Sequence, residues 1–128
     1  MSILARNTEC NDDVDECLTA YPVTKKYVWR RFAFEYTPSD IYLRAVCFSL
    51  ADHANDNGEA WPALKLIQYE IGATENTVMD RIKQLASAGF LVCSKRRYNG
   101  AKWRHNHYQL AVPEYLLSTY VFHMGASA

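Results

Sequence analysis

The stretch that decides the fold is residues 64–89, which read LKLIQYEIGATENTVMDRIKQLASAG. Its first half ends at Gly72, a residue typical of helix C-termini, and Thr74 is a good N-cap for the second half. Apolar residues recur at helical spacing in each half, namely Leu64, Ile67 and Ile71, then Val78, Ile82 and Leu85. The stretch therefore predicts two helices joined by a tight turn, the second ending at Ala88-Gly89.

A two-stranded hairpin is predicted directly after these helices. Residues 90–98 and 102–110 read as strands, and Asn99-Gly100 between them is typical of a type I′ turn. Because successive strand residues face opposite sides, Tyr108 and Leu110 are expected to point together into the core.

Another helix is predicted before the pair, with Thr37 as N-cap, Pro38 at its first position and an end near His53. Its sides are nearly all apolar, so the rest of the chain or a second copy must cover it. The cluster Asn55-Asp56-Asn57-Gly58 then predicts a turn.

The two ends of the chain are predicted from weaker patterns. Residues 27–34 are rich in aromatic and β-branched side chains and predict a short strand, and Pro113 starts a final short helix. We divide the chain into an acidic N-terminal arm (1–25), anchored by Leu18 and Tyr21, a central domain (26–112), and a C-terminal helix and tail (113–128).

Composition and charge narrow the function. The chain has 128 residues, 49% of them hydrophobic and 22% charged, which suits one globular domain and excludes wholesale disorder. The net charge is zero, yet residues 1–20 hold five acids against one base, and residues 81–104 hold seven bases and no acid. No signal peptide or membrane span is evident, so we expect a cytoplasmic chain with reduced cysteines and no membrane partner.

Particular residues also resemble a known family. They are LADHAN at 50–55, GEAWP at 58–62, IGAT at 71–74, IKQL at 82–85, AGFL at 88–91 and NHYQL at 106–110. These are similar to a winged-helix family of phage and plasmid replication proteins and related DNA-binding regulators, over about residues 37–112. The expected class is α+β: a winged helix-turn-helix with a three-helix core, a β-hairpin wing, a short N-terminal strand and a C-terminal helix.

The resemblance implies that the chain binds double-stranded DNA and acts in replication or transcriptional control of a mobile element. Asn76 suits adenine, whereas Glu75 and Asp80 repel phosphate at positions that are commonly Arg-rich in the family. The candidate DNA-binding residues are Thr74, Asn76, Thr77, Asp80, Arg81, Lys83 and Gln84 on the helix, and Lys95, Arg96, Arg97, Tyr98, Lys102 and Arg104 on the hairpin.

Other interpretations stay open at this point. The acidic helix could have lost base reading, leaving an adaptor for a protein partner, or the acidic arm could mimic nucleic acid or fold onto the basic hairpin. His105 and His107 lack a third ligand nearby and predict surface histidines, so we expect no metal, no cofactor and no catalysis.

We also expect a homodimer. In this hypothesis Tyr42, Val46 or Leu50 stays partly exposed and meets a C-terminal apolar set across a two-fold axis. The alternative is a monomer whose final helix folds back and covers its own predicted helix at about 37–53. The C-terminal set is Leu116, Leu117, Tyr120 and Val121.

Overall fold

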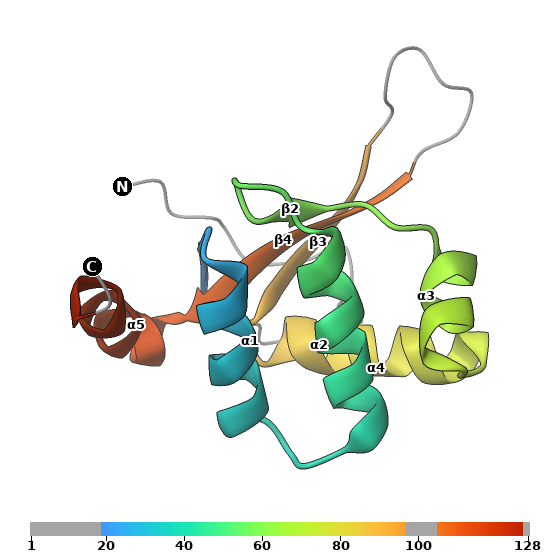
Figure 1. Ribbon diagram of the computed structural model, residues 1–128, viewed down its shortest axis with the longest axis horizontal. Helices are drawn as coiled ribbons and strands as arrows, with labels where there is room; N and C mark the ends of the chain where they lie inside the picture. The colour runs from blue at the N-terminus through green and yellow to red at the C-terminus, as the bar shows by residue number, and fades with distance from the viewer. Residues whose placement is uncertain (1–18, 97–104, 127–128) are drawn as a thin grey trace.

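The computed structural model describes residues 19–96 and 105–126. Figure 1 shows their arrangement as helices packed beside a small antiparallel sheet. The elements in chain order are β1 (Ala20–Pro22), α1 (Lys26–Glu35), α2 (Ile41–His53), β2 (Glu59–Ala60), α3 (Leu64–Ile71), α4 (Glu75–Ser87), β3 (Leu91–Arg96), β4 (His105–Pro113) and α5 (Glu114–Ala126).

Strand β4 is the centre of the sheet because each of the other three strands pairs with it in antiparallel fashion. Its C-terminal part pairs with β1, with Tyr21 opposite Val112. Its middle pairs with the two-residue β2 and with β3, so that Tyr108 faces both Ala60 and Cys93 in register. The β3–β4 pair is the predicted hairpin, and its turn at Asn99-Gly100 lies outside the described residues.

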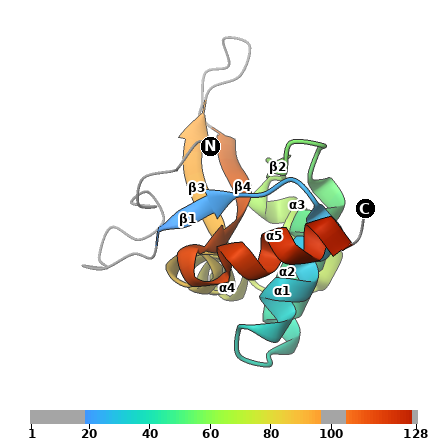
Figure 2. The ribbon, with the colours of Figure 1, turned by 90° about the vertical axis from the view of Figure 1, so that its left-hand side faces the viewer.

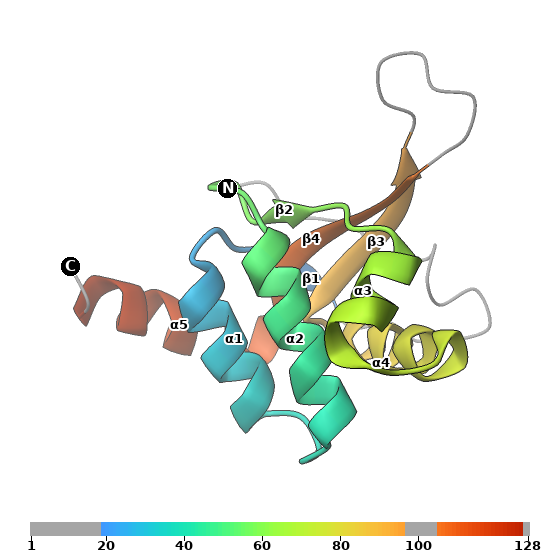
Figure 3. The ribbon, with the colours of Figure 1, turned by 45° about the vertical axis from the view of Figure 1, so that its right-hand side comes forward.

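The helices α2, α3 and α4 form the three-helix core, and the chain has the expected α+β winged-helix architecture. Helices α1 and α2 lie side by side, and α3 and α4 lie together on the side away from α5 (Figures 1 and 3). The predicted inward pair Tyr108 and Leu110 is buried, which confirms that expectation. Apolar side chains that are fully enclosed in this core include Val46, Leu50, Ile67, Val78, Leu85, Phe90 and Leu91.

The helix-turn-helix was predicted correctly from local signals. Gly72 ends α3 with φ of 69°, the left-handed conformation that glycine tolerates best. Thr74 caps α4 by accepting a hydrogen bond from the Thr77 backbone N–H at 3.3 Å. The Asn55–Gly58 turn is also confirmed, since the Gly58 N–H donates to the Asn55 carbonyl at 3.0 Å.

The prediction of a strand at 27–34 is wrong, because these residues form α1. The buried residues Trp29, Phe32 and Ala33 follow the i, i+3, i+4 spacing of a helix face. Trp29 is fully buried and its Nε1–H donates to the Phe90 carbonyl at 2.9 Å. Tertiary packing of this face overrides the strand preference of the aromatic side chains.

The predicted start of α2 is also wrong. Asp40, rather than Thr37, is the N-cap, and its Oδ1 accepts from the backbone N–H groups of Tyr42 and Leu43 at 2.8 and 2.9 Å. The hydroxyl of Thr37 instead donates to the carbonyl of Ala33, in the last turn of α1.

The expectation that Tyr42, Val46 or Leu50 stays partly exposed is met by one of the three. Tyr42 is 42% exposed, as predicted, whereas Val46 and Leu50 are fully buried. The cover comes partly from α1, which packs against α2 where the sequence had suggested a strand.

The C-terminal apolar set divides between core and surface. Leu116 and Tyr120 are buried within the chain and Leu117 is partly buried, whereas Val121 is exposed. Helix α5 runs beside α1 and β1 (Figure 2). The buried members therefore face their own chain, but α5 packs mainly on β4, α1 and β1 rather than on α2, which the intramolecular alternative had expected it to cover.

The N-terminal arm and the cysteines add two observations. The division at residues 25/26 stays a prediction, while the Ala20–Pro22 segment of the arm forms β1 and Tyr21 is buried, which confirms Tyr21 as an anchor. Cys47 is buried and free, but Cys93 is disulfide-bonded, so the expectation of reduced thiols is wrong for Cys93. None of the helices in the described ranges has the length and hydropathy of a bilayer-spanning segment.

Candidate nucleic-acid interface

The outward side of α4 is polar because its inward side supplies the core. Val78, Ile82 and Leu85 point inward, which leaves Asn76, Lys83 and Gln84 exposed on the other side. Thr74 and Asp80 are also exposed. Thr77 is partly buried, and its hydroxyl accepts a hydrogen bond from the Thr74 hydroxyl. The predicted helix residues therefore lie on one accessible surface, with one exception.

The exception is Arg81, which is held by two carboxylates. Its guanidinium lies 3.2 Å from Asp40 Oδ2 and 2.7 Å from Asp80 Oδ2, with the side chain only 20% exposed. Hydrogen bonding to Asp40 is the main cause that raises the pKa of Arg81. The pKa of Asp40 is lowered, chiefly by the Leu43 N–H and then by Arg81. Arg81 thus joins α4 to the N-cap of α2, a role that its sequence position did not reveal.

Asp80 also orients a neighbouring side chain. Its Oδ2 accepts from Gln84 Nε2 at 2.8 Å, one helical turn along α4. This hydrogen bond uses one amide N–H of Gln84 and leaves a second N–H and the carbonyl oxygen for a ligand. One donor beside one acceptor is the pattern that matches the major-groove edge of adenine.

The wing begins beside this helix, and the structure describes its base. Lys95 is exposed and stands opposite Asn106, and Arg96 pairs in register with His105. The predicted contact residues Arg97, Tyr98, Lys102 and Arg104 lie outside the described residues, and their roles stay predictions.

The base of the wing contains a cluster that the sequence did not reveal. His107, predicted as a surface histidine, is 2% exposed, so that prediction is wrong. Its Nε2 lies 3.2 Å from Glu59 Oε2, and the half-exposed ring of Trp61 stacks on its imidazole with ring centres 6.2 Å apart. The cover comes from β2, which is too short to leave a periodic signal in the sequence. The cluster ties the wing to the chain that enters α3.

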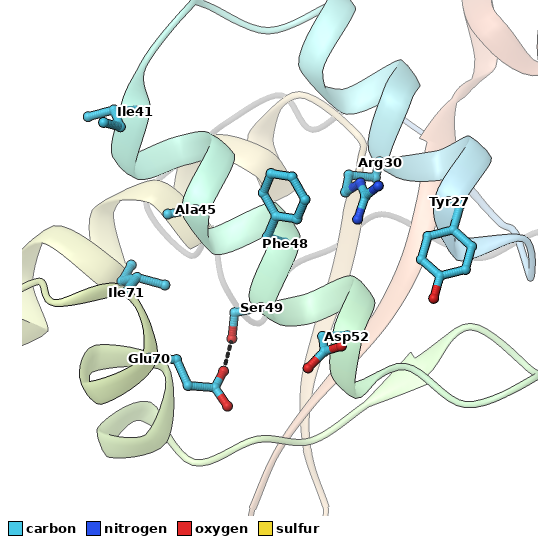
Figure 4. Close-up of a pocket in the computed structure, with 9 residues that line it drawn as sticks. All are labelled: Tyr27, Arg30, Ile41, Ala45, Phe48, Ser49, Asp52, Glu70 and Ile71. Atoms are coloured by element: carbon cyan, nitrogen blue, oxygen red, sulfur yellow. Dashed lines mark hydrogen bonds between the residues drawn. The ribbon is translucent and has the colours of Figure 1, made fainter.

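A shallow groove of about 550 Å³ lies on another side of the molecule, between α1, α2 and α3 (Figure 4). The guanidinium of Arg30 in α1 lies over the ring of Phe48 in α2, with its central carbon 4.3 Å from the centre of that ring. At the other end, Ser49 of α2 donates to Glu70 of α3 at 2.8 Å.

The Glu70 carboxylate fixes α3 on α2. It accepts from the Ser49 hydroxyl and lies 2.9 Å from His53 Nε2. Burial acts to raise the pKa of Glu70, but the hydrogen bonds from His53 and Ser49 outweigh it and keep that pKa below its ordinary value. The interaction is structural, since it connects the first two helices of the three-helix core.

In the part of the chain that the structure describes, no three His, Cys, Asp or Glu side chains lie close enough together to hold a metal ion. The described geometry instead combines an exposed polar helix with the base of a β-hairpin.

Comparisons with known proteins agree with this geometry. Residues 43–91, from the first turn of α2 to the start of β3, match the family model described as a helix-turn-helix domain. The chain is 33% identical over 86 residues to Protein YmfN of Escherichia coli (strain K12), an alignment that covers 64% of this chain and 19% of that protein. The chain thus spans about a fifth of that relative. No solved structure matches this chain. The helix-turn-helix match suggests DNA binding.

Proposed function

We propose that this chain binds double-stranded DNA, with α4 entering the major groove and the β3–β4 wing meeting the adjacent backbone. The observation that carries the proposal is the exposed polar side of α4, which lies within the segment that matches the helix-turn-helix domain. The major groove, about 12 Å wide, admits one helix, and amide side chains recognise adenine there.

The proposal assigns different work to the two elements. Asn76 and Gln84 read base edges, while Lys83 and the hydroxyls of Thr74 and Thr77 meet the backbone. Asp80 orients Gln84, and Arg81 positions α4 through its ion pairs. The wing residues Lys95, Arg96, Arg97, Tyr98, Lys102 and Arg104 add contacts to phosphate and sugar that carry no sequence information.

The biological role that we propose is replication or transcriptional control of a phage, plasmid or other mobile element, without catalysis. The support is the resemblance of the 50–62 and 106–110 segments to the winged-helix family of such elements. A homodimer would match two DNA half-sites, as two-fold symmetric regulators do.

A salt titration of binding to random duplex DNA tests the proposal. Affinity should fall steeply with salt, because each phosphate contact releases counterions and adds about 0.9 to the log–log slope. Replacing Arg96 and Arg97 together by Ala should reduce the slope by about one to two units. The matched control replaces Lys25 and Arg31, two exposed bases at α1, and should leave the slope unchanged.

An adaptor that binds a protein partner is the second candidate. It is favoured by the charges on α4, where Glu75 and Asp80 are exposed acids and Arg81 is already paired. Absence of binding to any duplex at about 50 mM salt would favour the adaptor and reject DNA binding.

A further inference from the structure

Cys93 in β3 is disulfide-bonded, and its partner lies outside the described residues. The sequence has four cysteines, and Cys47, the other described one, is buried and free. Elimination leaves Cys10 and Cys17, both in the N-terminal arm, as the partners that the chain can supply. A disulfide to either of them joins the arm to β3.

Cys93 lies where the basic part of the wing begins. It is 4% exposed and stands opposite Tyr108 of β4 in register. Lys95, two residues further along β3, is exposed, and the rise per strand residue puts it about 7 Å from Cys93 along the strand. A segment bonded to Cys93 therefore starts within side-chain reach of the first base of the wing.

The arm also enters the fold beside this sheet. Strand β1, near the end of the arm, pairs with β4 and lies close to β3 (Figure 2). The N–H of Glu114, at the start of α5, donates to the carbonyl of Thr19 at 3.2 Å. Residues 1–18 are thus joined, at Thr19, to the sheet that holds Cys93.

The charges of the arm and of the wing are opposite. Residues 1–18 hold five acids against one base, whereas residues 93–104 hold five bases and no acid. Opposite charges on two segments that meet attract each other and stabilise the contact. The acids are Glu9, Asp12, Asp13, Asp15 and Glu16, and the bases are Lys95, Arg96, Arg97, Lys102 and Arg104.

The positions of the arm cysteines bring these charges together. Glu9 precedes Cys10 and Glu16 precedes Cys17, so either disulfide places a carboxylate one residue from the bond. Neighbouring Cα atoms are about 3.8 Å apart, which keeps that carboxylate within about 10 Å of the wing base, the Debye length at 0.1 M salt. Salt therefore screens the attraction only in part.

We propose that a disulfide between Cys93 and Cys10 or Cys17 holds the acidic arm on the basic wing, with its carboxylates at positions that phosphate would take. Reduction opens this contact: a dithiol such as dithiothreitol supplies two electrons and two protons, the S–S bond becomes two thiols, and the reductant leaves as its own disulfide. The arm then stays attached only through β1, and the local concentration of its carboxylates at the wing falls. Competition of the arm with DNA rests on the proposed function; the disulfide and the charge contact do not.

Peptide mapping of the full chain tests the disulfide. The chain is purified without thiol, alkylated in denaturant, cleaved with trypsin and analysed by mass spectrometry. The peptide of residues 84–95 should be linked to that of residues 7–25 in a chain that stays monomeric on a non-reducing gel, and Cys47 should carry the alkyl label. Alkylated Cys93, a bond between Cys10 and Cys17, or a bond of Cys93 to Cys47 or to a second chain overturns the proposal.

Retention on immobilised heparin, a sulfated polyanion, tests the charge contact without DNA. The oxidised chain should elute at lower salt than the chain kept in dithiothreitol, because the carboxylates of the arm neutralise bases of the wing. Replacing Asp12, Asp13 and Asp15 together by Asn should remove most of that difference.

The matched control for the heparin measurement changes three exposed acids of the described fold, Glu35→Gln, Asp52→Asn and Asp56→Asn. It alters the net charge equally and should keep the difference between the oxidised and reduced chains. Equal elution of the two wild-type forms, or a difference that both triple variants keep alike, overturns the charge contact.

Binding to random duplex DNA connects the contact with the proposed function. At about 50 mM salt the reduced chain should bind at least about fivefold more tightly than the oxidised chain, and the gap should narrow as salt screens the arm. Cys10→Ser combined with Cys17→Ser should bind like the reduced chain without dithiothreitol, whereas Cys47→Ala should respond to dithiothreitol as the wild type does. Equal binding in the two redox states overturns the competition with DNA. Absence of binding by either form rejects the proposed function, a failure separate from the mapping and heparin results.

Discussion

The α3–α4 pair and the α1–α5 pair are built in different ways. The C-terminus of α3 and the N-terminus of α4 are fixed by residues at those ends themselves, a left-handed Gly72 and a Thr74 cap. Helix α1 has no side-chain cap, and its place depends on packing against α2, β4 and α5, with Trp29 hydrogen-bonded to the Phe90 carbonyl and Phe32 packed on Tyr120. Local signals thus define the helices of the candidate interface, while long-range packing defines the layer behind them.

The largest effect should come from removing the anchor of that layer. Trp29→Ala should lower the free energy of unfolding by about 3–5 kcal/mol, because it empties a fully buried site and removes the buried hydrogen bond from Trp29 to the Phe90 carbonyl. Urea unfolding followed by circular dichroism measures the change. Tyr69→Ala, at an 86% exposed site, should stay within about 0.5 kcal/mol. Equal losses would show that α1 is not held as described.

Gly58 and Gly72 share a left-handed backbone conformation but differ in their surroundings, so substituting each one separates the cost of backbone strain from the cost of a tertiary clash. Gly58 and Gly72 have φ of 75° and 69°, but a Cβ at Gly58 would lie 2.0 Å from the Val23 carbonyl oxygen, whereas one at Gly72 meets nothing within 4 Å. Gly72→Ala should cost about 1 kcal/mol through φ alone. Gly58→Ala should cost clearly more, because backbone must move. Thermal unfolding of both variants ranks them, and a reversed order contradicts this account.

Acid should weaken the contact between α2 and α3. The pKa of Glu70 lies below its ordinary value of 4.5, so its stabilising effect is complete above that pH and is lost as the pH falls through the lowered value. Wild type should therefore exceed Glu70→Gln in unfolding free energy at pH 7, and the difference should shrink toward pH 3. A difference that is constant with pH would mean that the charge of Glu70 does not contribute.

The smallest effect on stability is expected for Gln84→Ala, which should instead change the sequence preference of DNA binding. Gln84→Ala changes an exposed side chain and should alter stability by less than about 0.5 kcal/mol. On the proposed function, the change should relax base preference at one position by about 1–3 kcal/mol. Binding to a panel of single-base site variants measures it, with Lys83→Ala as the matched variant expected to weaken all sites alike. A uniform loss with Gln84→Ala would place this residue on the backbone.

The sequence by itself determined the helix-turn-helix and which side of its second helix faces the core. Gly72, Thr74 and the spacing of Val78, Ile82 and Leu85 act within a few residues, so their pattern is readable before the chain folds. The hairpin strands and the burial of Tyr108 and Leu110 follow from alternation in the same way.

The tertiary structure alone decided which residues work through distant partners. Arg81 reads as a DNA contact in the sequence, but Asp40, far away in the chain, pairs with it. His107 is buried because the β2 segment brings Glu59 and Trp61 over it, and α1 is a helix because α2, β4 and α5 pack against it. The physical reason is shared: each outcome depends on a contact across dozens of residues, whose energy is absent from any local pattern.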